Sequence, residues 1–401
     1  MLSKKYIREI VLEEIKIMFD ILMKILKAEL NGNMLDEQLK EQITPQIVAQ
    51  LYQISEKHDV LHIIGIALKR NQLIQDESVL NLYMRNTHLI AMRMEWLIHE
   101  QNEIMDLFEL EGIDYLPLKG AIIREYYPQP WLRTSSDIDI LVCQEQLEQA
   151  IALLIEKKAY KVQRKNYHDI VLYSPNGVRL ELHFSILEYD KKIDPVLEQV
   201  WQYAIPVQGT LHRYEMQPEY FMFHLVAHMY YHFVHGGCGI RFFGDLWLLK
   251  QNIKYDEKKL KTLCETCGLN IFLDYIWKML VIWFEEEKHD EVTIAMERYV
   301  ITGGLYGNEE SKVIVSKLDT ESRISYIWKR LFVPSNTLEN LYPKLKKRIY
   351  LYPYYSIKRF WDAFKEGRLK GVSNELYLNK TIQKDKIENI KVLFEKLNIQ
   401  N

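Results

Sequence analysis

The sequence predicts an α+β protein in which a small mixed β-sheet lies between N-terminal and C-terminal helical regions. Apolar residues recur at helical spacing from the N-terminus to about residue 102, and that spacing returns after about residue 206. Between these regions, short alternating or continuous apolar runs indicate strands. We therefore expect three parts: a helical region at 1–102, a sheet-containing core at 103–206 and a second helical region at 207–401.

The N-terminal region opens with a segment, residues 7–30, that is rich in Ile, Leu and Met. Acidic and basic residues interrupt this segment at helical spacing, which is typical of an amphipathic helix and not of a membrane span. We expect the helix to pack against the protein, since acidic residues on its polar face disfavour a membrane surface.

The core carries the strand patterns. The runs at 113–118 and 137–142 come first, a helix is predicted at 145–157, and further strands are expected at 160–162, 170–173 and 178–184. The last two strands are separated by Ser174, Pro175, Asn176 and Gly177, which favour a tight turn. These two strands should therefore form a hairpin.

The C-terminal region again has helical spacing. Helices are predicted at 220–235, 239–250 and 271–285, with Pro218 at a helix start.

Composition limits the class of protein. Hydrophobic residues make up 48% of the 401 residues and charged residues 27%, as in ordinary globular proteins. The net charge of −3 gives no overall attraction to nucleic acid or to anionic membranes. The four cysteines are irregularly placed, so we interpret the single pair Cys264 and Cys267 as a coincidence of helical sequence. The N-terminus lacks the pattern of a cleaved signal, and we expect a cytoplasmic protein without a transmembrane segment.

Three acidic residues carry the most informative pattern. Side chains alternate along a strand, so Asp137 and Asp139 should lie on one face while Ile138 and Ile140 enter the core. Glu181 lies on another alternating strand and supplies a third carboxylate. Carboxylates this close repel one another unless a cation neutralises them. The pattern therefore predicts a site for divalent metal, Mg²⁺ or Mn²⁺, held by Asp137, Asp139 and Glu181.

The order of these motifs resembles the polymerase-beta-like nucleotidyltransferase superfamily, in particular its uncharacterised bacterial members with an LKG, an R-x-SSDIDILV and an ELH segment. Here these segments are 118–120, 133–142 and 181–183, and the resemblance covers roughly residues 101–203. It implies that a nucleoside monophosphate passes from a nucleoside triphosphate, ATP in the first instance, to a hydroxyl-bearing acceptor, and that pyrophosphate leaves. It also implies that Asp137 and Asp139 bridge two metals, while Glu181 completes the second and accepts the hydroxyl proton.

The resemblance also implies a phosphate site at Gly120. In the superfamily this glycine is followed by Gly or Ser, whereas here Ala121 follows. Phosphate binding must then rely on backbone N–H groups or basic side chains. Lys119 and Arg133 are the expected cations. The alternative for each is an ion pair with a local acid such as Asp137 or Glu125.

Three further residues are candidates for nucleotide binding. Ser136 precedes the acidic strand, where its hydroxyl either meets a phosphate oxygen or makes an ordinary turn. His183 lies on the same face as Glu181, and it either supports a metal ligand or acceptor, or is a half-buried strand histidine. Arg241 would lie near the triphosphate, although an i,i+4 pair with Asp245 is the simpler expectation.

Two other patterns favour structural interpretations. A helix would align His224, His228, His232 and His235 on one face, where packing or lining of a cleft is preferred over metal binding. Basic and aromatic residues alternate over residues 323–370. This mixture suits single-stranded nucleic acid, an anionic membrane or an acidic acceptor, but a helix face with extended basic side chains is the favoured interpretation.

The sequence thus favours a metal-dependent nucleotidyltransferase whose acceptor is a small molecule, a peptide or a protein. A catalytically inactive nucleotide-binding or scaffold protein of the same fold is one alternative. An RNA-modifying nucleotidyltransferase is another, with nucleic acid the less favoured partner.

Overall fold

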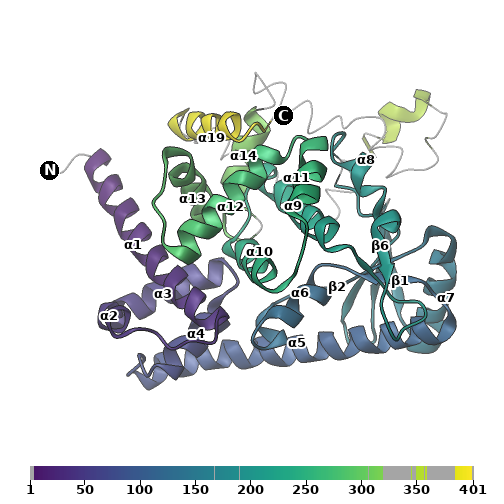
Figure 1. Ribbon diagram of the computed structural model, residues 1–401, viewed down its shortest axis with the longest axis horizontal. Helices are drawn as coiled ribbons and strands as arrows, with labels where there is room; N and C mark the ends of the chain where they lie inside the picture. The colour runs from purple at the N-terminus through teal and green to yellow at the C-terminus, as the bar shows by residue number, and fades with distance from the viewer. Residues whose placement is uncertain are drawn as a thin grey trace. The chain divides into compact units, whose positions relative to one another are not determined.

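The protein forms two compact units. The computed structural model describes residues 4–166, 168–188, 190–305, 307–318, 345, 349–355, 357–358 and 384–399 (Figure 1). The first unit comprises residues 1–229 and 239–293, and the second comprises residues 230–238 and 294–401. All of the strands among the described residues belong to the first unit.

Five helices open the first unit: α1 (Lys4–Leu30), α2 (Glu37–Gln42), α3 (Pro45–Lys57), α4 (Leu61–Arg70) and α5 (Glu77–Glu111). Side-chain oxygens of Asp36, Thr44 and Asp76 accept hydrogen bonds from the first turns of α2, α3 and α5 and so fix where these helices begin. Helix α5 is 35 residues long and ends at Gly112, whose φ of 74° favours glycine. This helix runs past residue 102, and the predicted domain boundaries remain predictions.

A mixed five-stranded sheet follows, in the order β1-β2-β5-β4-β3. The elements of this part are β1 (Tyr115–Pro117), α6 (Gly120–Ile123), β2 (Ile138–Val142), α7 (Leu147–Lys158), β3 (Lys161–Lys165), β4 (Asp169–Tyr173) and β5 (Arg179–His183). Strands β2 and β5 are parallel, and the other neighbouring pairs are antiparallel. The predicted hairpin is present as β4 and β5.

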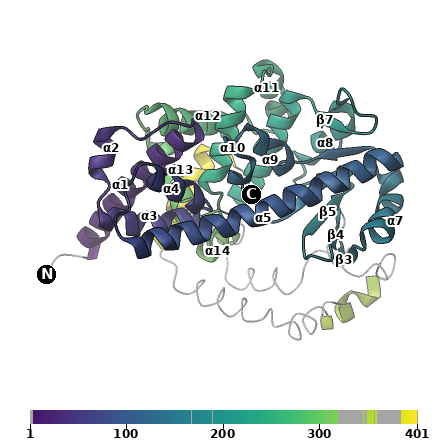
Figure 2. The same cartoon turned by 90° about the horizontal axis from the view of Figure 1, so that it is seen from below.

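The core lies between one face of the sheet and two helices. Ile138, Ile140, Leu180 and Leu182 are at most 1% exposed and pack with apolar residues of α5 and α7. The long helix α5 and the sheet lie side by side in both views (Figures 1 and 2). Because the apolar side chains of β2 and β5 face this core, the residues between them must face the other way.

The remaining elements are α8 (Asp194–Leu197), β6 (Ala204–Pro206), β7 (Tyr214–Met216), α9 (Pro218–Val234), α10 (Ile240–Asn252), α11 (Glu257–Thr266), α12 (Asn270–Glu285), α13 (Glu291–Gly303), α14 (Glu309–Leu318) and α19 (Lys384–Lys396). The helices predicted at 220–235, 239–250 and 271–285 correspond to α9, α10 and α12. The two-stranded sheet of β6 and β7 was not predicted, because each strand has only three residues.

The α+β prediction is confirmed. Within the described ranges no helix combines the length and the apolar character that crossing a bilayer would need. The basic aromatic segment at 323–370 lies outside the described residues apart from 345, 349–355 and 357–358.

Replacing a buried sheet residue should destabilise the first unit strongly. Leu182→Ala removes a fully buried side chain from the centre of the sheet and should lower the free energy of unfolding by about 2–5 kcal/mol, measured by urea denaturation. Val162→Ala on the edge strand β3, 37% exposed in the native protein, is the control and should change it by about 0.5 kcal/mol. Equal effects would contradict the assigned register.

Candidate functional site

The three predicted acids lie together on one face of the sheet, where β2 is paired with β5. Asp139 of β2 is the register partner of Glu181 of β5, so the two side chains are direct neighbours on one face of the sheet. Asp137 comes immediately before β2, two residues from Asp139 and on the same face. We call Asp137, Asp139 and Glu181 the acidic cluster. The geometry predicted for these acids is present.

Arg179 is the basic partner of this cluster. Its guanidinium lies 3.6 Å from Asp137 Oδ2 and also contacts the Glu181 carboxylate. The residue was not singled out from the sequence, although it lies two positions before Glu181 and therefore on the same face of an alternating strand. Ser136 is exposed, and its hydroxyl donates to Asp137.

His183 extends the cluster along β5. Its Nε2 lies 3.0 Å from Asp139 Oδ1 and 3.6 Å from Glu181 Oε2. Ligand atoms of Asp139, Glu181 and His183 all lie within 4.8 Å of one another, a spacing that could hold a metal ion. The predicted position of His183 beside Glu181 is therefore observed.

Burial and mutual repulsion set the ionisation of the acids. Burial and the nearby Asp139 charge raise the pKa of both Asp137 and Glu181. Burial also opposes ionisation of Asp139, but the hydrogen bond and charge of His183, together with Lys119, outweigh it and hold the pKa of Asp139 below its usual value. Asp139 therefore ionises most readily of the three, and added positive charge would favour the ionised form of its two neighbours.

Lys119 supplies part of that positive charge. Its Nζ lies 3.2 Å from His228 Nδ1, which lies 2.6 Å from Glu188 Oε1. Burial opposes ionisation of Glu188, but His228 and Lys119 outweigh it and lower the pKa of Glu188 to about 2. Burial and the Lys119 charge in turn lower the pKa of His228. No sequence signal pointed to Glu188, which follows β5 in a loop.

The Lys119 backbone is held in an unusual conformation. Its φ is 37°, in the region that side chains other than glycine rarely adopt. A side chain at the next residue, Gly120, would have to displace the Arg133 guanidinium, because a Cβ there would lie 2.6 Å from Arg133 Nη1. The LKG motif therefore places the Lys119 ammonium near the acidic cluster and brings the Arg133 guanidinium against the backbone at Gly120.

Arg133 pairs with an acid, but not with the local acid, such as Asp137 or Glu125, that was expected as its alternative partner. Its Nη2 lies 3.0 Å from Asp245 Oδ2, and both side chains are buried. The Tyr127 hydroxyl donates to the other oxygen of this carboxylate at 2.8 Å. The partner Asp245 lies on α10, more than 100 positions away in the chain, so no local pattern could identify it.

Arg241 also holds the loop before β2. Its Nη1 lies 2.8 Å from Asp59 Oδ2 and donates to the Thr134 hydroxyl at 2.9 Å. Arg241 and Asp245, one helical turn apart on α10, thus bind the consecutive residues Thr134 and Arg133. Both therefore position the segment that leads into the acidic cluster, and a role of Arg241 at the triphosphate stays a prediction.

The histidine row divides between the two units. His224 and His228 belong to the first unit, whereas His232 and His235 belong to the second. His224 is 1% exposed, and burial, with the Lys119 charge, lowers its pKa well below the usual value. Cys264 and Cys267 lie in and directly after α11 as free thiols.

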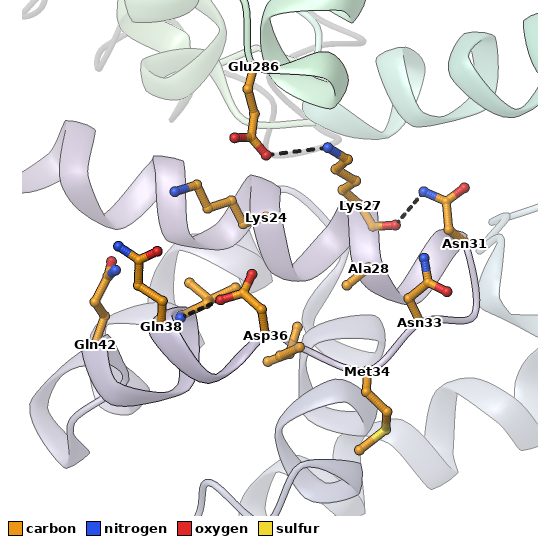
Figure 3. Close-up of a pocket in the computed structure, with 12 residues that line it drawn as sticks. Lys24, Lys27, Ala28, Asn31, Asn33, Met34, Asp36, Gln38, Gln42 and Glu286 are labelled. Atoms are coloured by element: carbon orange, nitrogen blue, oxygen red, sulfur yellow. Dashed lines mark hydrogen bonds and ion pairs between the residues drawn. The ribbon is translucent and has the colours of Figure 1, made fainter.

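A separate polar cavity of about 270 Å³ lies beside α1 and contains none of the predicted site residues (Figure 3). Lys24 and Lys27 of α1 border it together with Asp36 and Gln38 at the start of α2. Two of the lining residues, Lys27 and Glu286, form an ion pair in which Nζ lies 3.4 Å from Oε1. We assign it no role.

Comparisons with known proteins identify the class of this fold and site. The model of a family described as "uncharacterised nucleotidyltransferase" matches residues 45–285, which is more than half of the chain. The protein belongs to this family.

Among solved structures, the chain is similar to the antibiotic-resistance factor ANT(2″)-Ia at 10% sequence identity and a TM-score of 0.33. The match covers 48% of this chain and 100% of the other. No curated protein matches.

Breaking the buried ion pair should destabilise the protein. Asp245→Ala leaves the Arg133 guanidinium buried without its carboxylate and should lower the free energy of unfolding by about 3–5 kcal/mol. Lys278→Ala removes an exposed pair with Asp290 and should change it by less than about 1 kcal/mol. Chemical denaturation of both variants checks this, and a loss of similar size in each would show that Arg133 does not depend on Asp245.

Proposed function

We propose that the protein transfers a nucleoside monophosphate from a nucleoside triphosphate, ATP in the first instance, to a hydroxyl-bearing acceptor in a metal-dependent reaction that releases pyrophosphate. One observation carries the proposal: Asp139 and Glu181 are register partners on parallel strands, with Asp137 two residues away, in a member of a nucleotidyltransferase family. The proposal names the acceptor only by class, as a small molecule, a peptide or a protein.

The side chains of the acidic cluster fit a hard divalent cation. They offer carboxylate oxygens from two adjacent strands, and the raised pKa values of Asp137 and Glu181 reflect negative charge that a cation would offset. Asp137, Asp139 and Glu181 would hold the metal, Mg²⁺ or Mn²⁺. A bound cation would neutralise triphosphate charge and stabilise the attacking and leaving oxygens.

The residues around the cluster suit the remaining steps. The Lys119 ammonium, whose charge acts on both aspartates, is positioned to neutralise phosphate oxygens. As the acceptor oxygen bonds to the α-phosphorus, the bond to the bridging oxygen breaks and pyrophosphate leaves. Glu181 receives the hydroxyl proton, which suits a carboxylate whose pKa is raised.

We place this reaction in the cytoplasm. All four cysteines are free thiols, which agrees with a reducing compartment. Nucleoside triphosphate is the required partner, and nucleic acid is not favoured as the acceptor because the net charge is −3.

A triphosphate should stabilise the protein against heat only when Mg²⁺ or Mn²⁺ is present. At one hundred times the dissociation constant the stabilisation is about 2.7 kcal/mol, and Asp139→Asn should abolish it because the central ionised ligand is lost. Differential scanning fluorimetry with and without EDTA measures both effects. Equal stabilisation without metal would rule out the proposed metal dependence.

Label transfer tests the reaction itself. Each α-labelled triphosphate is incubated with cell extract and protein, and the component that acquires label is identified. Asp139→Asn should transfer none. Binding of a triphosphate without any transfer would favour the alternative of an inactive nucleotide-binding protein.

Removing the Lys119 charge should weaken triphosphate binding. Lys119→Met should raise the dissociation constant by about tenfold or more, because a charge-assisted contact to phosphate contributes about 1.5–3 kcal/mol. Isothermal titration calorimetry at fixed Mg²⁺ concentration measures the change, and Lys24→Met, at the separate cavity beside α1, is the control. Unchanged affinity in Lys119→Met would exclude contact between Lys119 and the phosphates.

A further inference from the structure

The two ring nitrogens of His183 differ in their polar contacts. The side chain is 7% exposed, and its Nδ1 is buried with no hydrogen-bond partner among the described residues. Its other nitrogen, Nε2, points to two carboxylate oxygens, at 3.0 Å on Asp139 and 3.6 Å on Glu181. Among the described residues, the polar contacts of the His183 ring are therefore those of Nε2 with the acidic cluster.

A proton on Nε2 cannot satisfy both carboxylates. One N–H group donates a good hydrogen bond along one direction, here to Asp139, while Glu181 lies beyond hydrogen-bond range. A cation shared by the nitrogen and the two oxygens would satisfy all three groups at once.

The spacing of these atoms suits such a cation. Adjacent ligands in an octahedral shell of about 2.1 Å radius lie about 3 Å apart. The separations of 3.0 and 3.6 Å at Nε2, within a set in which all ligand atoms lie within 4.8 Å, are close to that value. Only small side-chain movements are then needed to bind the ion.

We infer that His183 is a direct metal ligand through Nε2, so that Asp139, Glu181 and His183 form a site of two oxygens and one nitrogen. Imidazole nitrogen suits first-row transition metals, whereas Mg²⁺ prefers oxygen ligands. The site therefore takes Mn²⁺ in preference to Mg²⁺. This inference rests on the metal dependence in the proposed function and adds the identity of one ligand and the class of ion.

A second histidine, His168, lies against the His183 ring. The His168 ring stacks on His183 with centroids 5.8 Å apart and planes inclined by 27°. His168 itself lies 3.1 Å from Asp169, outside the acidic cluster. His168 thus contacts the His183 ring while its own ion pair is with a carboxylate outside the cluster, and it provides a matched control.

Pulsed electron paramagnetic resonance of the full-length protein with Mn²⁺ tests the inference. Directly bound nitrogen modulates the electron spin echo, so the native protein should show a ¹⁴N signal. His183→Gln should lose that signal, since its side chain can still donate a hydrogen bond to Asp139 but has no imidazole. His168→Gln should keep it, and circular dichroism verifies that both variants fold.

Metal affinities give a second measurement. The ratio of Mn²⁺ to Mg²⁺ affinity, from calorimetric titration, should fall by about tenfold in His183→Gln and stay unchanged in His168→Gln. Mn²⁺ that binds through Asp139 without a ¹⁴N signal would overturn the ligand assignment and leave the proposed function intact. Absence of any metal binding that depends on Asp139 would overturn both.

Discussion

The site depends on repulsion between carboxylates that the fold holds together. Hydrogen bonding between β2 and β5 fixes Asp139 beside Glu181, and the apolar core on the opposite face fixes the direction in which both side chains point. Folding therefore concentrates negative charge in a half-buried place. Arg179 and His183 of β5, together with Lys119, reduce this repulsion without removing it.

The positive groups differ in what they do. Arg179 contacts the carboxylates Asp137 and Glu181 from within β5, and Lys119 is drawn toward His228 and Glu188. Arg133, which precedes β2, forms a buried ion pair with Asp245. The loop before β2 is thus held by the buried Arg133–Asp245 pair, while the charge of Lys119 acts on the aspartates of the cluster.

The sequence identifies the residues whose placement follows from strand periodicity. Asp137, Asp139, Glu181 and His183 are found together because alternation along two strands determines their face, and the hairpin turn determines the pairing of β4 with β5. Side chains from distant helices or loops that pair with residues near the site cannot be identified from strand periodicity. Asp59 with Arg241, Asp245 with Arg133 and Glu188 with His228 are products of tertiary folding.

The attachment of the Arg133 and Thr134 segment to α10 has a consequence for how the molecule can be divided. Two anchors of this segment, Arg241 and Asp245, and a third, Asp59, lie outside residues 103–206. A fragment limited to the sheet would keep Asp137, Asp139 and Glu181 and yet lack the side chains that hold the segment leading into Asp137. The smallest fragment that keeps all three anchors therefore extends from Asp59 to α10.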